Sequence, residues 1–60
     1  MPWVTINVME GHSQEQKDIL FKKVTKSISE SLDLPSKYVK IQLIEMDWGN
    51  HSFDGKTRQK

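Results

Sequence analysis

The residue with the clearest chemical potential is Pro2, which directly follows the initiator methionine. Within a chain its nitrogen belongs to a tertiary amide and carries no hydrogen. If Met1 is removed, the same nitrogen becomes a rigid secondary amine that can accept a proton. A simpler interpretation is that Pro2 heads a strand, where the missing N–H costs little. The residue alone leaves both interpretations open.

An amine that acts as a base near neutral pH needs surroundings that disfavour its charged form. An ordinary terminal amine has a pKa of about 8 and is mostly protonated at neutral pH. Burial against apolar groups and a neighbouring cation both lower such a pKa. The sequence contains tryptophans that could supply the first effect, and lysines or a charged histidine that could supply the second. The chemistry of Pro2 therefore depends on the elements that position these residues.

Two segments alternate apolar and polar residues, a pattern typical of β-strands. The first covers residues 3–9 and the second covers residues 39–46. A long helix between them favours a right-handed crossover with parallel strands. The helix would leave one face of the strand pair uncovered. The apolar residues of that face are Trp3, Met9, Ile44 and Met46, a patch of the kind that marks an interface.

The helix is expected to begin near Gln14, because Ser13 and Gln16 form a capping-box signal. Pro35 disfavours helical backbone at the residue before it, so we expect the helix to end at residue 32 or 33. Apolar residues recur along it at spacings of three and four, which predicts one apolar stripe facing the strands. The stripe consists of Leu20, Phe21, Val24, Ile28 and Leu32.

The tail after the second strand carries Trp48, Phe53 and an Asp54-Gly55 turn signal. These residues indicate a short hairpin or an arm that reaches over a neighbour. Residues 56–60 are expected to be frayed, with their positive charges solvated. The chain has no internal repeat, linker or low-complexity segment. We therefore expect one α+β domain over residues 1–60.

The chain is short enough that its core needs reinforcement. A chain of 60 residues buries only about 60% of the surface that it exposes when unfolded. It has no cysteine for a disulfide or a thiolate metal site, and two histidines are too few for a closed zinc site. Oligomerisation is the expected source of the missing stability.

Charge and hydropathy exclude several classes of partner. Nine Lys and Arg against eight Asp and Glu give a net charge of +1, so neither nucleic acid nor an anionic membrane is expected. The apolar runs are too short for a transmembrane helix or a signal peptide, so we expect a cytoplasmic location. His12, His51 and Asp47 lack the spacing of a metal site, and no metal is expected.

Four segments resemble the 4-oxalocrotonate tautomerase family, from Met1 to about Gly49. They are MPWVTINVMEG, HSQEQK at the helix start, SISESLDLP and VKIQLIEM. The resemblance implies a β-α-β subunit that dimerises into a four-stranded sheet, with three dimers forming a hexamer. It also implies that Pro2, freed of Met1, is a general base that moves a proton in an enol or unsaturated 2-oxo acid. Neither a metal nor an organic cofactor is implied.

The chain departs from the family pattern at residues that would hold the substrate. Members that process dicarboxylates carry one arginine just after the first Glu-Gly and another near the start of the second strand. Here those positions are His12 and Lys40. Lysine keeps the charge but lacks the planar fork that binds a carboxylate at two points, and histidine carries a charge that depends on pH. The aromatic residue of the family's pocket aligns with His51, with Phe53 two residues further on.

Two functions follow from the resemblance. In the first, the chain is a homohexameric tautomerase, a trimer of dimers, in which Pro2 moves the proton of a small-molecule carboxylate substrate. Lys40 of a neighbouring subunit would hold a carboxylate, and His12 would assist binding. The same site would be lined by His51, Trp48 and Phe53.

In the second function, the missing arginine pair indicates a subunit that has lost catalysis and keeps the fold for assembly or binding. Hydratase, decarboxylase and dehalogenase variants remain open, because a protonated proline can act as an acid.

Overall fold

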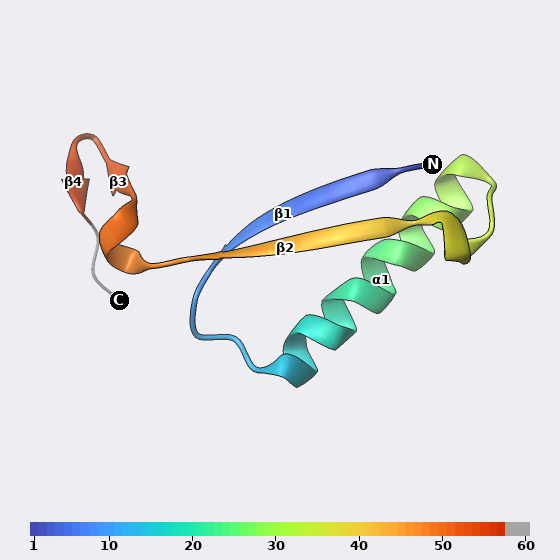
Figure 1. Ribbon diagram of the computed structural model, residues 1–60, viewed down its shortest axis with the longest axis horizontal. Coiled ribbons are helices and arrows are strands. Elements are labelled where there is room, and N and C mark those ends of the chain that lie inside the picture. Colours follow the sequence, from blue (N-terminus) through green and yellow to red (C-terminus); the bar gives the residue numbers. More distant parts are fainter. Residues whose placement is uncertain (58–60) are drawn as a thin grey trace.

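The computed structural model of the chain describes residues 1–57. In chain order the elements are β1 (Trp3–Met9), α1 (Gln14–Leu32), η1 (Ser36–Tyr38), β2 (Lys40–Met46), η2 (Trp48–Asn50), β3 (Ser52–Phe53) and β4 (Lys56–Thr57). The label η denotes a short 3₁₀-helix. The predicted order of strand, helix and strand is confirmed (Figure 1).

The two long strands pair in parallel along their whole length. The register runs from Trp3 opposite Lys40 to Met9 opposite Met46. One further backbone hydrogen bond extends the pairing, because Lys40 N–H donates to Pro2 O at 3.1 Å. Helix α1 returns the chain along one side of the strand pair (Figure 1). The predicted parallel connection through a helix is therefore confirmed.

Both ends of α1 carry stabilising contacts. Ser13 Oγ accepts a hydrogen bond from Gln16 N–H at 3.1 Å, and Gln16 Oε1 accepts one from Ser13 N–H at 3.0 Å. This reciprocal pair is the capping box that the sequence predicts. After the last turn, Asp33 adopts left-handed backbone with a φ of 53°, a conformation that commonly ends helices. The predicted bounds of the helix are confirmed.

The segment between α1 and β2 is more regular than a simple turn. Tyr38 N–H donates to Pro35 O and Val39 N–H donates to Ser36 O, both at 3.1 Å, which closes η1. The strand that we predicted from residue 39 therefore begins one residue later, at Lys40. The prediction is wrong there because the N–H of Val39 is used by η1 rather than by the strand ladder.

The tail folds into the predicted hairpin. Strands β3 and β4 pair antiparallel, and the turn between them places Asp54 and Gly55 at φ values of 54° and 75°. Two successive positive φ values suit a tight two-residue hairpin turn, for which Asp-Gly is a favoured sequence. Lys56 and Thr57 thus lie in β4 rather than in a frayed end. Residues 58–60 of the predicted frayed end lie outside the described residues.

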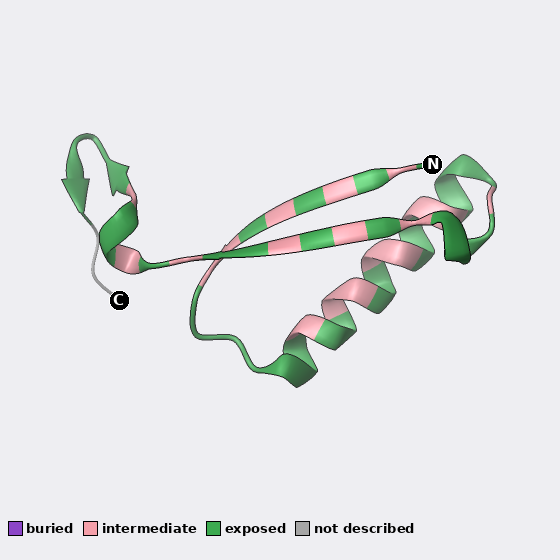
Figure 2. Ribbon diagram, in the orientation of Figure 1, coloured by how far each residue is buried: buried purple, intermediate pink, exposed green. Residues whose placement is uncertain are grey.

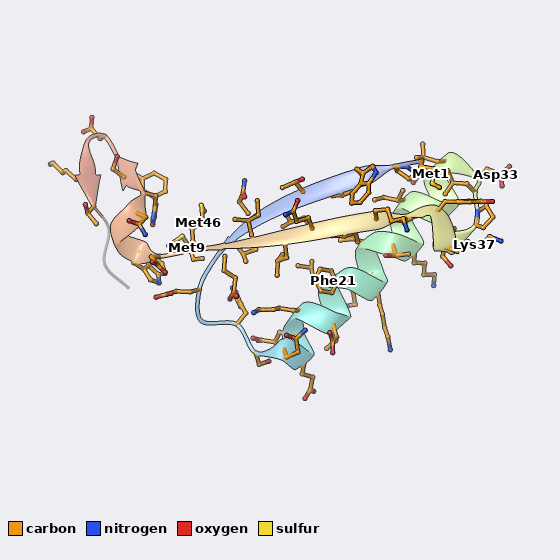
Figure 3. All side chains as sticks on the ribbon, in the orientation of Figure 1. Met1, Met9, Phe21, Asp33, Lys37 and Met46 are labelled. Atoms are coloured by element: carbon orange, nitrogen blue, oxygen red, sulfur yellow. The ribbon has the colours of Figure 1, made fainter. Side chains whose placement is uncertain are left out.

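None of the residues that the structure describes is buried (Figure 2). Trp3 is 73% exposed and Ile44 is 40% exposed, as predicted for the uncovered face of the sheet. Met9 and Met46 were expected to be exposed with them, but both are half-buried. They lie opposite each other in the strand ladder (Figure 3), so each covers part of the other.

The chain is long and thin for its size. Its extents are 42 × 24 × 13 Å and its radius of gyration is 14.4 Å, whereas a compact domain of this length has a radius of about 10 Å. Such a shape leaves little apolar burial to stabilise an isolated copy. Within the described residues, no helix combines the length and the apolar composition that crossing a membrane requires.

Candidate active site

Pro2 and Lys40 lie side by side at one end of the sheet. The hydrogen bond from Lys40 N–H to Pro2 O joins their backbones, and Trp3 lies directly opposite Lys40. Pro2 is half-buried, whereas Lys40 and Trp3 are exposed. With Met1 attached, the nitrogen of Pro2 is an amide; it becomes an amine once Met1 is removed. The fold thus brings the candidate base, one candidate cation and one candidate aromatic together.

A second cation, Lys37, lies at the same end of the molecule as Met1 (Figure 3). Its Nζ is 5.4 Å from the centre of the Tyr38 ring, a separation typical of a cation–π contact. The sequence analysis missed Lys37. No local pattern marks it, because its place depends on the path of the chain between α1 and β2.

His12 lies in the loop between β1 and α1, directly before the cap residue Ser13. It lines a pocket of about 220 Å³ whose other lining residues are Val8, Gln16, Lys17, Leu20 and Leu43. Lys17 Nζ forms an ion pair with Glu45 Oε1 of β2 at 2.9 Å, so a carboxylate already balances this lysine. The sequence analysis did not foresee the pair, because no spacing rule links a helix residue to a strand residue so far along the chain.

The tail gathers three candidate site residues, Trp48, His51 and Phe53, which we call the tail cluster. The ring centres of Trp48 and His51 lie 5.8 Å apart at 52°, and those of His51 and Phe53 lie 5.4 Å apart at 88°. The Asp47 carbonyl oxygen lies 3.3 Å from His51 Nδ1, and the Asp47 carboxylate accepts a hydrogen bond from Asn50 Nδ2 at 3.0 Å. These contacts hold the imidazole between two aromatic rings and a turn of backbone.

Trp48 contributes an unusual polar group to the tail cluster. Its Nε1 is enclosed by protein atoms and has no hydrogen-bond partner among the described residues. Buried donors in native proteins are nearly always paired, because an unpaired one costs free energy. This N–H is therefore an unpaired donor within the described part of the chain.

The candidate site residues occupy separate places in one chain. Pro2 and Lys40 lie where the two strands begin, whereas His12 and the tail cluster come after the strands have ended. A strand of 7 residues spans about 23 Å. Figure 1 shows the β3–β4 hairpin at the end of the molecule opposite the N-terminus. A pocket that contains both Pro2 and a tail cluster would therefore need a second copy of the chain.

The larger hollows of the surface lie elsewhere. One groove of about 540 Å³ follows α1 and is lined by Phe21, Lys22, Thr25, Lys26, Ser29, Glu30 and Ser36. A second of about 230 Å³ is lined by Phe21, Thr25, Val39 and Ile41. No candidate site residue lines either of them. Both include Phe21, which lies between α1 and the sheet (Figure 3), so both reflect the open packing of the helix on the strands.

The described part of the chain offers no cluster for a metal ion. Across residues 1–57, no three or more His, Cys, Asp or Glu side chains are grouped so that they could hold one. His12 and His51 lie in different segments, one before α1 and one after η2.

Comparison with known protein sequences identifies the family. The family model for tautomerases, described as tautomerase enzyme, matches residues 2–58. The chain is 38% identical over 60 residues to a 2-hydroxymuconate tautomerase from Pseudomonas putida, and the match covers 100% of this chain and 95% of that protein. The resemblance that the sequence predicts is therefore confirmed.

Solved structures agree with this assignment. A 4-oxalocrotonate tautomerase isozyme from Methylibium petroleiphilum gives a TM-score of 0.89 at 28% identity, covering 93% of this chain and 88% of that one. A heterohexamer 4-oxalocrotonate tautomerase from Chloroflexus aurantiacus J-10-fl also gives 0.89, at 24% identity, covering 95% and 92%. At that identity the second likeness concerns the fold alone. The chain belongs to the tautomerase family and is an isomerase.

Proposed function

We propose that the chain is a cofactor-independent tautomerase in which Pro2, freed of Met1, is the general base. The substrate is a small enol or unsaturated 2-oxo acid that resembles 2-hydroxymuconate. The observation that carries the proposal is the place of Pro2, half-buried directly before β1, in a chain of the tautomerase family. The P. putida relative, named for its action on 2-hydroxymuconate, supports this choice of substrate.

The proposed reaction moves one proton within the substrate. The amine of Pro2 accepts the proton, the electron pairs shift along the conjugated double bonds, and the amine returns a proton to carbon. Substrate and product are therefore isomers, and the enzyme is unchanged. Negative charge develops on the substrate oxygen during this exchange, and a nearby fixed cation stabilises it. We assign that role, and the binding of a carboxylate, to Lys40.

We also propose that the working enzyme is a hexamer, a trimer of dimers whose pockets form between subunits. Two observations support an assembly. The described residues include no buried core, and apolar side chains remain exposed on the uncovered face of the sheet. In such an assembly the tail cluster and His12 of one chain line the pocket of another chain's Pro2, and Lys40 comes from a neighbouring subunit.

The test is a Pro2→Ala substitution in protein whose intact mass shows that Met1 is gone. We expect the rate of ketonisation of 2-hydroxymuconate to fall by about 100-fold, because alanine supplies a flexible primary amine in place of the rigid secondary amine that proline positions as the general base. In the unsubstituted enzyme, the rate should fall as the pH drops below the pKa of the Pro2 amine, because a protonated amine cannot accept a proton. Unchanged turnover in Pro2→Ala would reject Pro2 as the base.

The second candidate is a catalytically degenerate subunit with an assembly or binding role. It is favoured by His12 and Lys40, which occupy the positions at which the family resemblance implies an arginine pair. Under this alternative the purified protein assembles but shows no turnover, or the native protein retains Met1. Rapid turnover that is lost in Pro2→Ala rejects it.

A further inference from the structure

We infer that the end of the substrate far from the reacting enol is an uncharged, apolar group. It binds in the pocket of about 220 Å³ that His12 lines, which we call the His12 pocket. The enzyme then prefers 2-hydroxy-2,4-dienoic acids that end in hydrocarbon over dicarboxylates. The inference rests on the proposed function, in which His12 of one chain lines the pocket of another chain's Pro2.

The charge of the His12 pocket is already balanced within the chain. Among its lining residues, Lys17 is the one side chain with a fixed charge. Lys17 Nζ lies 2.9 Å from Glu45 Oε1, and the two side chains are 18% and 41% exposed. Ion pairs that are partly buried are only weakly screened by salt. A second carboxylate on the substrate would have to displace Glu45 or lie beside it, and two adjacent carboxylates repel each other.

The remaining polar residues of the pocket carry no fixed charge. Gln16 Oε1 is used by the helix cap, because it accepts a hydrogen bond from Ser13 N–H at 3.0 Å. His12 lies at the exposed edge of the pocket, and an imidazole is charged only when it is protonated. Neither residue replaces the permanent charge of an arginine.

The walls of the His12 pocket are apolar and come from three elements. Val8 lies in β1, Leu20 in α1 and Leu43 in β2, and each is half-buried. Hydrocarbon that leaves water for such a surface stabilises the complex in proportion to the area covered. A carboxylate in the same place loses hydration without gaining a free cation. The pocket is therefore built for a hydrocarbon end.

The other end of the proposed site accounts for one carboxylate. Lys40 is the cation that we assign to the substrate, and among residues 1–57 it makes no ion pair. Lys17, in contrast, is held by Glu45. One free cation matches a substrate with one carboxylate, next to the enol, and an apolar group at the far end.

The test compares sorbate with trans,trans-muconate, which has the same conjugated chain but a carboxylate in place of the methyl group. Neither carries an enol hydroxyl, so the comparison measures binding alone. Dissociation constants are measured by isothermal titration calorimetry on the assembled protein without Met1, at about pH 8, where an ordinary histidine is neutral. We expect sorbate to bind about tenfold more tightly than muconate, because the second carboxylate is desolvated without a partner.

A substitution at Glu45 tests the cause of this preference. In Glu45→Gln, Lys17 is free to bind the second carboxylate, so muconate should bind about tenfold more tightly than it does to the unsubstituted protein. The constant for sorbate should not change, which also shows that the variant is folded. Glu30→Gln removes the same charge from an exposed position of α1 and should alter neither constant.

Two results overturn the inference. One is that sorbate fails to bind the unsubstituted protein, or binds no more tightly than muconate. The other is an unchanged constant for muconate in Glu45→Gln while sorbate still binds, since the far end of the ligand would then lie elsewhere. The proposed function has a separate test, because unchanged turnover by Pro2→Ala rejects Pro2 as the base, whereas these dissociation constants require no turnover.

Discussion

At the scale of single residues, Lys40 is the cation that we assign to the proposed site, where it serves the Pro2 of a neighbouring subunit. Its backbone N–H is bonded to Pro2 O of its own chain, so the end of the sheet fixes the position of both residues. The pairing is a consequence of strand register rather than of a special sequence at either residue. A lysine at this place supplies charge, whereas an arginine would supply charge and a bidentate grip.

The first prediction concerns this charge. Lys40→Met should lower kcat/KM for 2-hydroxymuconate by about 10- to 100-fold, because a charged hydrogen bond to a carboxylate is lost. Lys40→Arg should retain or raise it. The matched control is Lys23→Met, which removes an exposed lysine of α1 and should leave the kinetics unchanged. Equal kinetics for Lys40→Met and the unsubstituted enzyme would remove Lys40 from the proposed site.

At the scale of elements, the start of α1 links stability to the position of His12. The reciprocal bonds between Ser13 and Gln16 fix the first turn of the helix, and His12 is the residue directly before that cap. The Lys17–Glu45 ion pair ties the same turn to β2. The loop that carries His12 is thus held from the helix side by two independent sets of contacts.

Loss of the cap should therefore be measurable. Ser13→Ala should lower the free energy of unfolding by about 1 kcal/mol per subunit, because the N–H groups of the first turn lose an acceptor. Denaturation in urea, at a fixed protein concentration, measures this change. Ser27→Ala, an exposed position within α1, is the control and should be neutral or slightly stabilising, since alanine favours helix. Equal destabilisation by both substitutions would show that the cap has no special role.

At the scale of the whole molecule, the absence of buried residues within the described chain is the dominant fact. Apolar side chains from the strands and from α1 meet without enclosing one another, and the extents of 42 × 24 × 13 Å explain why. A thin layer of one helix on two strands has surface on both sides. Contacts between copies are therefore the expected source of its stability.

The corresponding prediction is that a charge on the uncovered sheet face prevents assembly. Ile44→Glu should convert the proposed hexamer into smaller or unfolded species and remove activity, because a carboxylate would be buried without a partner. Size-exclusion chromatography with light scattering and circular dichroism measure both effects. Ile19→Glu introduces the same charge at a helix position that is 47% exposed and should leave the assembly intact. An Ile44→Glu hexamer would show that this face is not an interface.

Much of the fold could be predicted because its signals are local. Alternation indicated both long strands, the capping box and Pro35 bounded α1, and Asp-Gly indicated the hairpin turn. Each signal depends on backbone preferences over a few residues. The predicted start of β2 was wrong by one residue at Val39. Its N–H could bond within a 3₁₀-turn or within the strand ladder, and the residue types alone do not show which bond forms.

The sequence by itself determined the family, through its matching segments, and also the candidate base. A proline after Met1 is a covalent feature of the chain, so it can be identified without knowledge of the fold. Only the tertiary structure decided which candidates meet. Parallel pairing brings Lys40 to Pro2, although the two lie far apart along the chain, and sends His12 and the tail cluster toward the other end. These outcomes depend on the direction of strands and on contacts between distant atoms, which no short stretch of sequence encodes.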